Sequence, residues 1–131
     1  LVRMLNLATG RVKWTHQEDR EASLAGAPPQ VRAWGEHIYL AVRRNHGVEL
    51  DRLDMSDGTS AWKSNTAFLD ADCVNLANAD ADADRIYVPA GNTLSAFALK
   101  DGKSAWEADL PDTRGAGGWV VKAGQRLISA P

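Results

Sequence analysis

Residues 53–62 read LDMSDGTSAW, in which Gly58 is followed four residues later by Trp62. Two other stretches have nearly the same form, LNLATGRVKW at residues 5–14 and FALKDGKSAW at residues 97–106. The glycines of the three stretches lie 48 and then 44 residues apart, and the tryptophans keep the same intervals. A period of this length is typical of stacked or radial repeat architectures.

A second set of echoes keeps the same order along the chain. HIYLAV at residues 37–42, RIYVPA at residues 85–90 and RLISAP at residues 126–131 each begin with a polar residue and continue with alternating apolar ones. This alternation predicts strands that present one face to a core. No window of useful length holds apolar residues at positions i, i+3, i+4 and i+7, so the pattern argues against helical repeats.

Turn signals divide each unit into four strands. Residues 43–47 (RRNHG) and residues 91–92 (GN) follow two of the alternating strands and fit a reversal, and the Thr-Gly or Asp-Gly pairs of the quoted stretches fit a second tight turn. A weaker strand precedes the alternating one at residues 30–34 and 118–124, and the polar residues 75–84 (NLANADADAD) take its place in the middle unit. Four short antiparallel strands per period predict an all-β fold made of β-propeller blades.

The three quoted stretches resemble the tryptophan-docking motif of pyrroloquinoline-quinone-like (quinoprotein-type) β-propellers, written Ala-x-Asp-x-x-Thr-Gly-x-x-x-Trp. The resemblance covers nearly the whole chain. It implies that the tryptophan of one blade packs against the glycine of a neighbouring blade, where an indole can lie flat because no Cβ intervenes. The matching blade-docking residues are Gly10, Trp14, Gly58, Trp62, Gly102 and Trp106.

The first and third motif positions depart from the pattern. The alanine position is occupied by Met4, Arg52 and Ala96, and the aspartate position by Asn6, Asp54 and Ala98. Only the last unit keeps the small first residue, so looser packing is expected at the first two blades.

The predicted domain organisation is a single partial propeller over residues 1–131. Residues 1–16 end one blade, residues 31–64 form a second, residues 74–109 form a third and residues 117–131 begin a fourth. Propellers close with about four blades or more, so we expect the chain to be an excerpt of a longer polypeptide. The alternative is that copies of the chain assemble around an axis.

Charge and composition exclude several classes of partner. The formal net charge of −2 and the pI of about 5.9 provide no basic face for nucleic acid, and the basic pair Arg43-Arg44 is assigned to a turn. No apolar run approaches the roughly 20 residues that cross a bilayer, so no membrane span is expected, and the first residues lack the plan of a signal peptide. The single Cys73 excludes an internal disulfide and is expected to be a small buried hydrophobe.

The acidic residues 69–84 (LDADCVNLANADADAD) hold the oxygen-rich side chains that calcium prefers. They do not form an EF-hand, because a loop starting at Asp80 would place Arg85 at the glycine position and Gly91 at the glutamate position. A solvated strand edge or loop is the alternative that we favour, and along a strand the alternation would place every carboxylate on one face. The weak calcium candidates are Asp70, Asp72, Asp80, Asp82 and Asp84.

The three histidines, His16, His37 and His46, show no zinc-ligand spacing and fall in different strands or turns. No catalytic constellation stands out from the structural repeats, so no catalytic residue is assigned and the cofactor-binding residues are unknown.

Two functions remain open. The favoured one is a noncatalytic binding, scaffold or sensor propeller that engages a protein partner, or the remaining blades of its own propeller. The alternative implied by the resemblance is a fragment of a quinoprotein dehydrogenase that oxidises an alcohol or sugar with pyrroloquinoline quinone and calcium. Members of the family are mostly exported bacterial proteins, so the resemblance also implies a periplasmic or cell-surface location.

Overall fold

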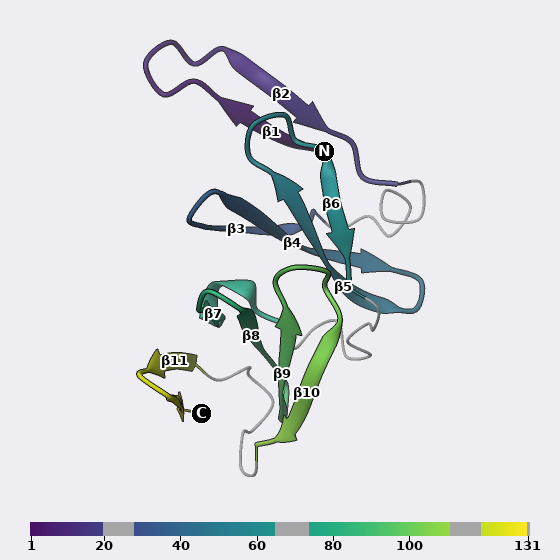
Figure 1. Ribbon diagram of the computed structural model, residues 1–131. Coiled ribbons are helices and arrows are strands. Elements are labelled where there is room, and N and C mark those ends of the chain that lie inside the picture. Colours follow the sequence, from purple (N-terminus) through teal and green to yellow (C-terminus); the bar gives the residue numbers. More distant parts are fainter. Residues whose placement is uncertain (20–27, 65–73, 111–118, 131) are drawn as a thin grey trace.

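The computed structural model describes residues 1–19, 28–64, 74–110 and 119–130. In these residues the strands form four antiparallel sheets that follow one another along the chain (Figure 1). The first sheet holds β1 (Val2–Leu5) and β2 (Val12–His16), and the second holds β3 (Gln30–Trp34), β4 (His37–Arg44), β5 (Gly47–Asp54) and β6 (Ser60–Lys63). The third holds β7 (Asp80–Ala81), β8 (Arg85–Ala90), β9 (Thr93–Ala98) and β10 (Ser104–Asp109), and the fourth holds β11 (Trp119–Ala123) and β12 (Arg126–Ala130).

Each four-stranded sheet is a meander in which strands adjacent in sequence are hydrogen-bonded neighbours. We call β3 to β6 the first complete blade and β7 to β10 the second complete blade. The N-terminal hairpin, β1 and β2, corresponds to the last two strands of a blade, and the C-terminal hairpin, β11 and β12, to the first two. The all-β propeller-blade architecture predicted from the repeats is confirmed.

The turn before the last strand of each unit has the same geometry in all three copies. In the first complete blade the amide of Gly58 donates to the carbonyl of Asp54 at 2.9 Å, and the amide of Asp54 donates to the carbonyl of Thr59 at 2.9 Å. Gly58 has a φ of 77°, which a residue with a Cβ adopts only at a cost. The strand pairing also shifts by one residue beside this turn, at Met4/Leu5, Arg52/Leu53 and Ser104/Trp106. The quoted motif is therefore one repeated turn with a β-bulge beside it.

The reversal at residues 43–47 is shorter than the sequence indicates. β4 continues through Arg44, β5 begins at Gly47, and only Asn45 and His46 form the turn. The assignment of Arg43-Arg44 to the turn is therefore wrong. Arg44 is 5% exposed, and its guanidinium pairs with Asp51 at 2.9 Å and with Glu49 at 2.9 Å, which offsets the cost of burying its charge.

The acidic segment of the middle unit is also less regular than its alternation suggests. Residues Leu76–Asn78 form a 3₁₀ helix, η2, and only Asp80–Ala81 pair as strand β7 before the chain turns at residues 82–84. For residues 75–84 the strand-edge form of the expectation is therefore wrong, and the turn at residues 82–84 agrees with the loop form. The side chain of Asn75 accepts from the amide of Ala77 and so starts the helix instead.

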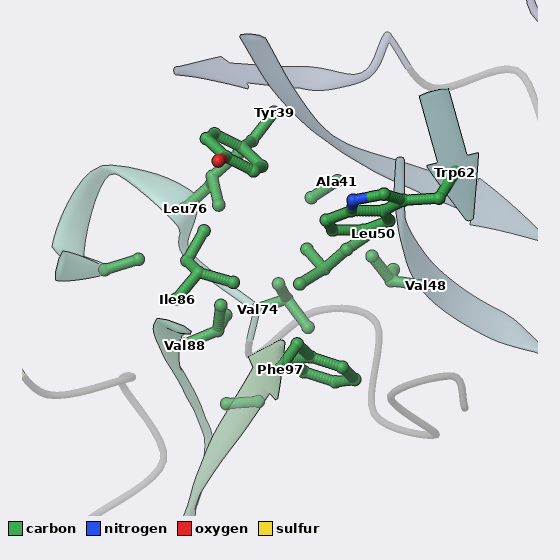
Figure 2. Packing of buried hydrophobic residues seen from close by; sticks show 12 residues of the cluster. Tyr39, Ala41, Val48, Leu50, Trp62, Val74, Leu76, Ile86, Val88 and Phe97 are labelled. Atoms are coloured by element: carbon green, nitrogen blue, oxygen red, sulfur yellow. The ribbon is translucent and has the colours of Figure 1, made fainter. Parts of the chain in front are cut away.

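The core lies between the sheets. Figure 2 shows Tyr39, Leu50 and Trp62 of the first complete blade packed toward Ile86 and Phe97 of the second. The opposite face of β4 packs Ile38, Leu40 and Val42 against the N-terminal hairpin. Because β4 is covered on both faces, it is a nearly continuous apolar run, and neighbouring blades share their hydrophobic cores.

Candidate functional site

Two tryptophans of the repeated motif, Trp14 and Trp62, lie on glycines of the following unit. A Cβ added to Gly58 would lie 2.5 Å from Cε3 of Trp14, and one added to Gly102 would lie 2.4 Å from Cε3 of Trp62. Each indole also donates a hydrogen bond, from Trp14 Nε1 to the carbonyl of Met55 at 2.9 Å and from Trp62 Nε1 to the carbonyl of Leu99 at 2.7 Å. The two contacts have the same geometry.

Gly10 of the N-terminal hairpin and Trp106 of the second complete blade are the docking residues that take no part in these two contacts. No atom would lie within 4 Å of a Cβ added to Gly10. Trp106 is partly buried and packs beside Tyr87, with 5.9 Å between the ring centroids. The side chain of Leu7, at the tip of the N-terminal hairpin, is fully exposed.

A row of cross-strand neighbours lies on the face that the first complete blade turns toward the second. Strand pairing places Arg32 opposite Tyr39, Tyr39 opposite Arg52, and Arg52 opposite Trp62. Side chains paired in this way lie on one face of a sheet. The corresponding row of the second complete blade is Asp80, Tyr87, Ala96 and Trp106.

The first member of each row connects neighbouring units. Arg32 Nη1 donates to the carbonyl of Leu76 in η2 at 3.3 Å and to that of Ala79, just after η2, at 2.7 Å. Its guanidinium lies 4.4 Å from the ring centroid of Trp34. Asp80 Oδ2 accepts from the backbone amide of Lys122 in the C-terminal hairpin at 2.7 Å. Both side chains thus satisfy backbone groups of the next unit.

A cavity of about 590 Å³, which we call the first hollow, lies between the two complete blades beside the row that contains Tyr39 and Arg52. It opens at the end of the blades where the turns at residues 35–36, 82–84 and 99–103 come together, which we call the turn face. Its aromatic and ionisable lining residues are Trp34, Glu36, His37, Tyr39 and Arg52 of the first complete blade and Asp82 and Lys100 of the second.

A second hollow of about 280 Å³ lies between the second complete blade and the C-terminal hairpin. Its lining includes Tyr87 and Trp106, which correspond to Tyr39 and Trp62, and Asp82, which lines both hollows. The other polar lining residues are Arg85, Lys122, Gln125 and Arg126. The hydroxyl of Tyr87 donates to Asp82 Oδ2 at 2.7 Å. The hollows are therefore a repeated feature of the fold, and their polar groups differ.

Two residues that line the first hollow hold a buried polar atom with no hydrogen-bond partner among the described residues, namely the hydroxyl of Tyr39 and Nε of Arg52. Tyr39 is completely buried, and Arg52 uses Nη1 to donate to the carbonyl of Leu99 at 2.6 Å. Burial raises the pKa of Tyr39, and the positive charge of Arg52 opposes that rise. An unsatisfied buried donor is unfavourable by about 1 to 3 kcal/mol, so this pair is the strongest chemical signal among the described residues.

The calcium candidates that the structure describes are Asp80, Asp82 and Asp84. The oxygens of Asp80 accept from backbone amides of Ala81 and Lys122, and Asp82 Oδ1 accepts from the amides of Asp84 and Arg85. Burial alone would raise the pKa of Asp82, but hydrogen bonds from the Tyr87 hydroxyl and these amides lower it below its usual range. Asp70, Asp72 and Cys73 lie outside the described residues.

In the described part of the chain, no group of three or more His, Cys, Asp or Glu side chains is placed to hold a metal ion. His16 lies at the end of β2, with Nδ1 3.0 Å from the carbonyl oxygen of Gly58. His37 begins β4 beside the ring of Tyr39, and His46 lies in the next turn beside Glu49. The three histidines are thus in different elements.

Sequence reasoning missed the pairing of Tyr39 with Arg52 and the contacts of Arg32. The one available signal was the motif's alanine position, which Arg52 occupies and which faces the docking tryptophan of its own blade. Among the described residues, no helix is long and apolar enough to cross a membrane.

Meander sheets packed face to face, with the tryptophan of one unit on the glycine of the next, define blades of a pyrroloquinoline-quinone-like β-propeller. A family model described as outer membrane protein assembly factor BamB matches residues 2–126, and the chain belongs to this family. No curated protein sequence gives a significant match.

Among solved structures, the chain is similar to the crystal structure of BamB from Moraxella catarrhalis, with a TM-score of 0.61 and 16% sequence identity. The match covers 96% of this chain and 39% of that one, so this chain spans well under half the length of the relative. At this identity the likeness is one of fold.

Proposed function

We propose that this chain supplies blades to a noncatalytic propeller that acts as a protein-interaction scaffold at the bacterial cell envelope. The observation that carries the proposal is the family match over residues 2–126 to an outer membrane protein assembly factor. The structure resembles BamB over nearly the whole of this chain. A rigid stack of blades that presents turns at its ends is a suitable scaffold for a protein partner.

The proposed blade boundaries are residues 1–16, 31–64, 74–109 and 117–131, with each tryptophan docking one unit onto the next. The contacts of Trp14 with Gly58 and of Trp62 with Gly102 support this role. The space over Gly10 and the exposure of Leu7 are suited to a further unit packing against the N-terminal hairpin. The chain therefore forms a partial propeller in this proposal.

The use of the polar side chains supports a noncatalytic role. Arg32 and Asp80 satisfy backbone groups of neighbouring units, and Asp82 holds a turn and the hydroxyl of Tyr87. These side chains thus hold the blades and their turns together, which is a structural use of their polar groups. A periplasmic or surface location follows from the family resemblance and belongs to the same proposal.

Site-specific photo-crosslinking in the native host tests the scaffold role. A photoreactive residue replaces Glu36 or Lys100, which are exposed on the turn face, and the matched controls replace Asn45 or Asn92, which are exposed at the opposite end of the blades. We expect discrete crosslinks to an envelope protein from the turn-face positions and weaker ones from the controls. Crosslinking that is equal at both ends, or absent from both, would contradict a partner-binding turn face.

The quinoprotein alternative has its own readout. Purified protein is mixed with pyrroloquinoline quinone and Ca²⁺, and dye-linked oxidation of alcohols and sugars is measured. We expect no turnover above that of the free quinone with Ca²⁺. Turnover that requires the protein would replace the scaffold proposal with the dehydrogenase.

A further inference from the structure

The two hollows contain the same tyrosine in two different hydrogen-bonding states. Strand register places Tyr39 opposite Arg32 and Tyr87 opposite Asp80, so Asp80 corresponds to Arg32. Two residues further along the chain, Asp82 therefore corresponds to Trp34. In the second hollow Tyr87 donates to the Asp82 carboxylate at 2.7 Å. In the first hollow Trp34 packs edge-on against Tyr39, with 5.3 Å between the ring centroids, and provides no carboxylate.

The two hollows also differ in the residue that lies opposite the tyrosine, which is positively charged in the first hollow and apolar in the second. Arg52 lies directly opposite Tyr39 on the neighbouring strand, whereas the corresponding residue of the second complete blade is Ala96. One side of the Arg52 guanidinium is held, because Nη1 donates to the carbonyl of Leu99 at 2.6 Å, and that carbonyl also accepts from Trp62. Within the part of the chain that the structure describes, the Nε–H of Arg52 and the hydroxyl of Tyr39 have no acceptor.

Tyr39 and Arg52 both line the cavity, each holds a buried donor without an acceptor among the described residues, and the charge of Arg52 favours an anion as the acceptor. A guanidinium N–H can only donate, and charge-assisted bonds to carboxylate are about twice as strong as neutral ones. The second hollow shows which group this fold places next to the tyrosine, namely a carboxylate. The cavity of about 590 Å³ is larger than an acetate or an acidic side chain requires.

We propose that the first hollow is a carboxylate-binding site, in which Arg52 Nε and the Tyr39 hydroxyl donate to a carboxylate from outside the chain. The carboxylate takes the place that Asp82 occupies beside Tyr87. It comes either from a small free acid or from an acidic side chain of a protein, and the test separates these sources. The site does not depend on the proposed scaffold function.

The Nε–H resonance of Arg52 in ¹H–¹⁵N NMR spectra of the full chain is a direct readout. The peak is assigned by its absence from Arg52→Ala and is followed during titration with sodium acetate, with sodium chloride at equal ionic strength as the control. A parallel titration uses the capped peptide Gly-Asp-Gly against capped Gly-Asn-Gly. We expect saturable shifts with the carboxylates and none with chloride or the asparagine peptide.

The acetate titration and the peptide titration together identify the source of the carboxylate. Saturation by acetate as well as by the aspartate peptide supports a site open to small acids, and saturation by the peptide alone supports an acidic side chain of a protein. An Nε–H peak that neither probe moves would overturn the proposal and leave ordered water as the partner of both donors. Equal shifts with chloride would also overturn it, because the effect would then be one of general ionic strength.

Variants tie the shift to this cavity through the indole resonance of Trp34, which every variant except Trp34→Asp retains. Arg52→Ala, which installs the residue found at the corresponding position of the next blade, should weaken binding about tenfold or more, and Tyr39→Phe roughly 2- to 10-fold. Tyr87→Phe is the matched control in the second hollow and should leave the affinity unchanged. Equal losses in Tyr39→Phe and Tyr87→Phe would contradict the assignment.

Trp34→Asp is a second, independent variant that keeps both donors. It installs a carboxylate at the position of Asp82 and should shift the Arg52 Nε–H peak without any added acid, while acetate no longer moves it. An unshifted peak that still responds to acetate would mean that the carboxylate position has been misplaced.

Discussion

At the scale of single residues, the contact between Trp62 and Gly102 joins the two complete blades. The indole lies against the glycine, where a side chain would meet it at 2.4 Å, and its Nε1–H is held by the carbonyl of Leu99. Gly10 has the same backbone conformation, with a φ of 69° against 74° for Gly102, but no atom lies over it. Alanine substitutions at these two glycines therefore separate the free-energy cost of the left-handed backbone from the cost of disturbing the contact with the indole.

We expect Gly102→Ala to destabilise the protein more than Gly10→Ala. Both variants force alanine into the left-handed region, which is unfavourable by roughly 1 to 2 kcal/mol. Gly102→Ala also displaces the hydrogen-bonded indole of Trp62, which adds about 1 to 3 kcal/mol. Urea unfolding followed by circular dichroism measures both free energies. Equal losses in the two variants would mean that the indole moves aside freely and that the contact contributes little.

At the scale of strands and turns, the local signals in the sequence predicted the local structure. The alternation at residues 37–42 and 85–90 became β4 and β8, and the Asp57-Gly58 and Asp101-Gly102 pairs became turns with left-handed glycines. Such signals depend on a few consecutive residues, so they can be read without knowing what lies across the sheet.

The contacts that the sequence did not reveal join residues far apart in the chain. Arg32 binds carbonyls of η2 some 45 residues later, and the side chain of Asp80 binds the amide of Lys122. Arg44 resembles a solvated turn residue until its ion-pair partner Asp51, on the neighbouring strand, is known. The hollow around Tyr39 and Arg52 likewise requires the register of two strands and the presence of the next blade.

The turn between β7 and β8 provides a prediction about pH. The pKa of Asp82 is lowered in the folded state, because hydrogen bonds from Tyr87 and two amides outweigh its partial burial. A carboxyl whose folded pKa lies below its unfolded value adds stability above the unfolded pKa of about 3.8, and this stability is lost as the pH falls through the folded pKa. Asp82→Asn should therefore lower the free energy of unfolding by about 1 kcal/mol at pH 7.

The difference between Asp82→Asn and the unmodified chain should shrink as the pH falls below about 4, because both then carry an uncharged group at this position. Asp84→Asn, exposed in the same turn, is the matched control and should stay close to the unmodified chain. Urea unfolding at a series of pH values from neutral to acidic gives the comparison. A constant difference across this range would show that the charge of Asp82 does not contribute.

At the scale of the whole molecule, stability comes from the interfaces between successive units. The largest buried cluster lies between the two complete blades, and smaller ones join each hairpin to its neighbouring blade. β4 and β5 are mostly buried, whereas most residues of β2 are exposed. In such a linear series, each unit depends chiefly on its nearest neighbours, and units with a single neighbour are held least firmly.

We therefore expect native-state hydrogen exchange to follow the position of a sheet in this series. Amides of β4 and β8, which are covered on both faces, should exchange most slowly, and amides of the N-terminal and C-terminal hairpins should exchange at least about tenfold faster. Addition of urea below the unfolding transition should widen the difference, because the hairpins can open without the central interface. Uniform protection across all four sheets would instead show that the units unfold as one cooperative block, with the hairpin contacts as strong as the interface between the complete blades.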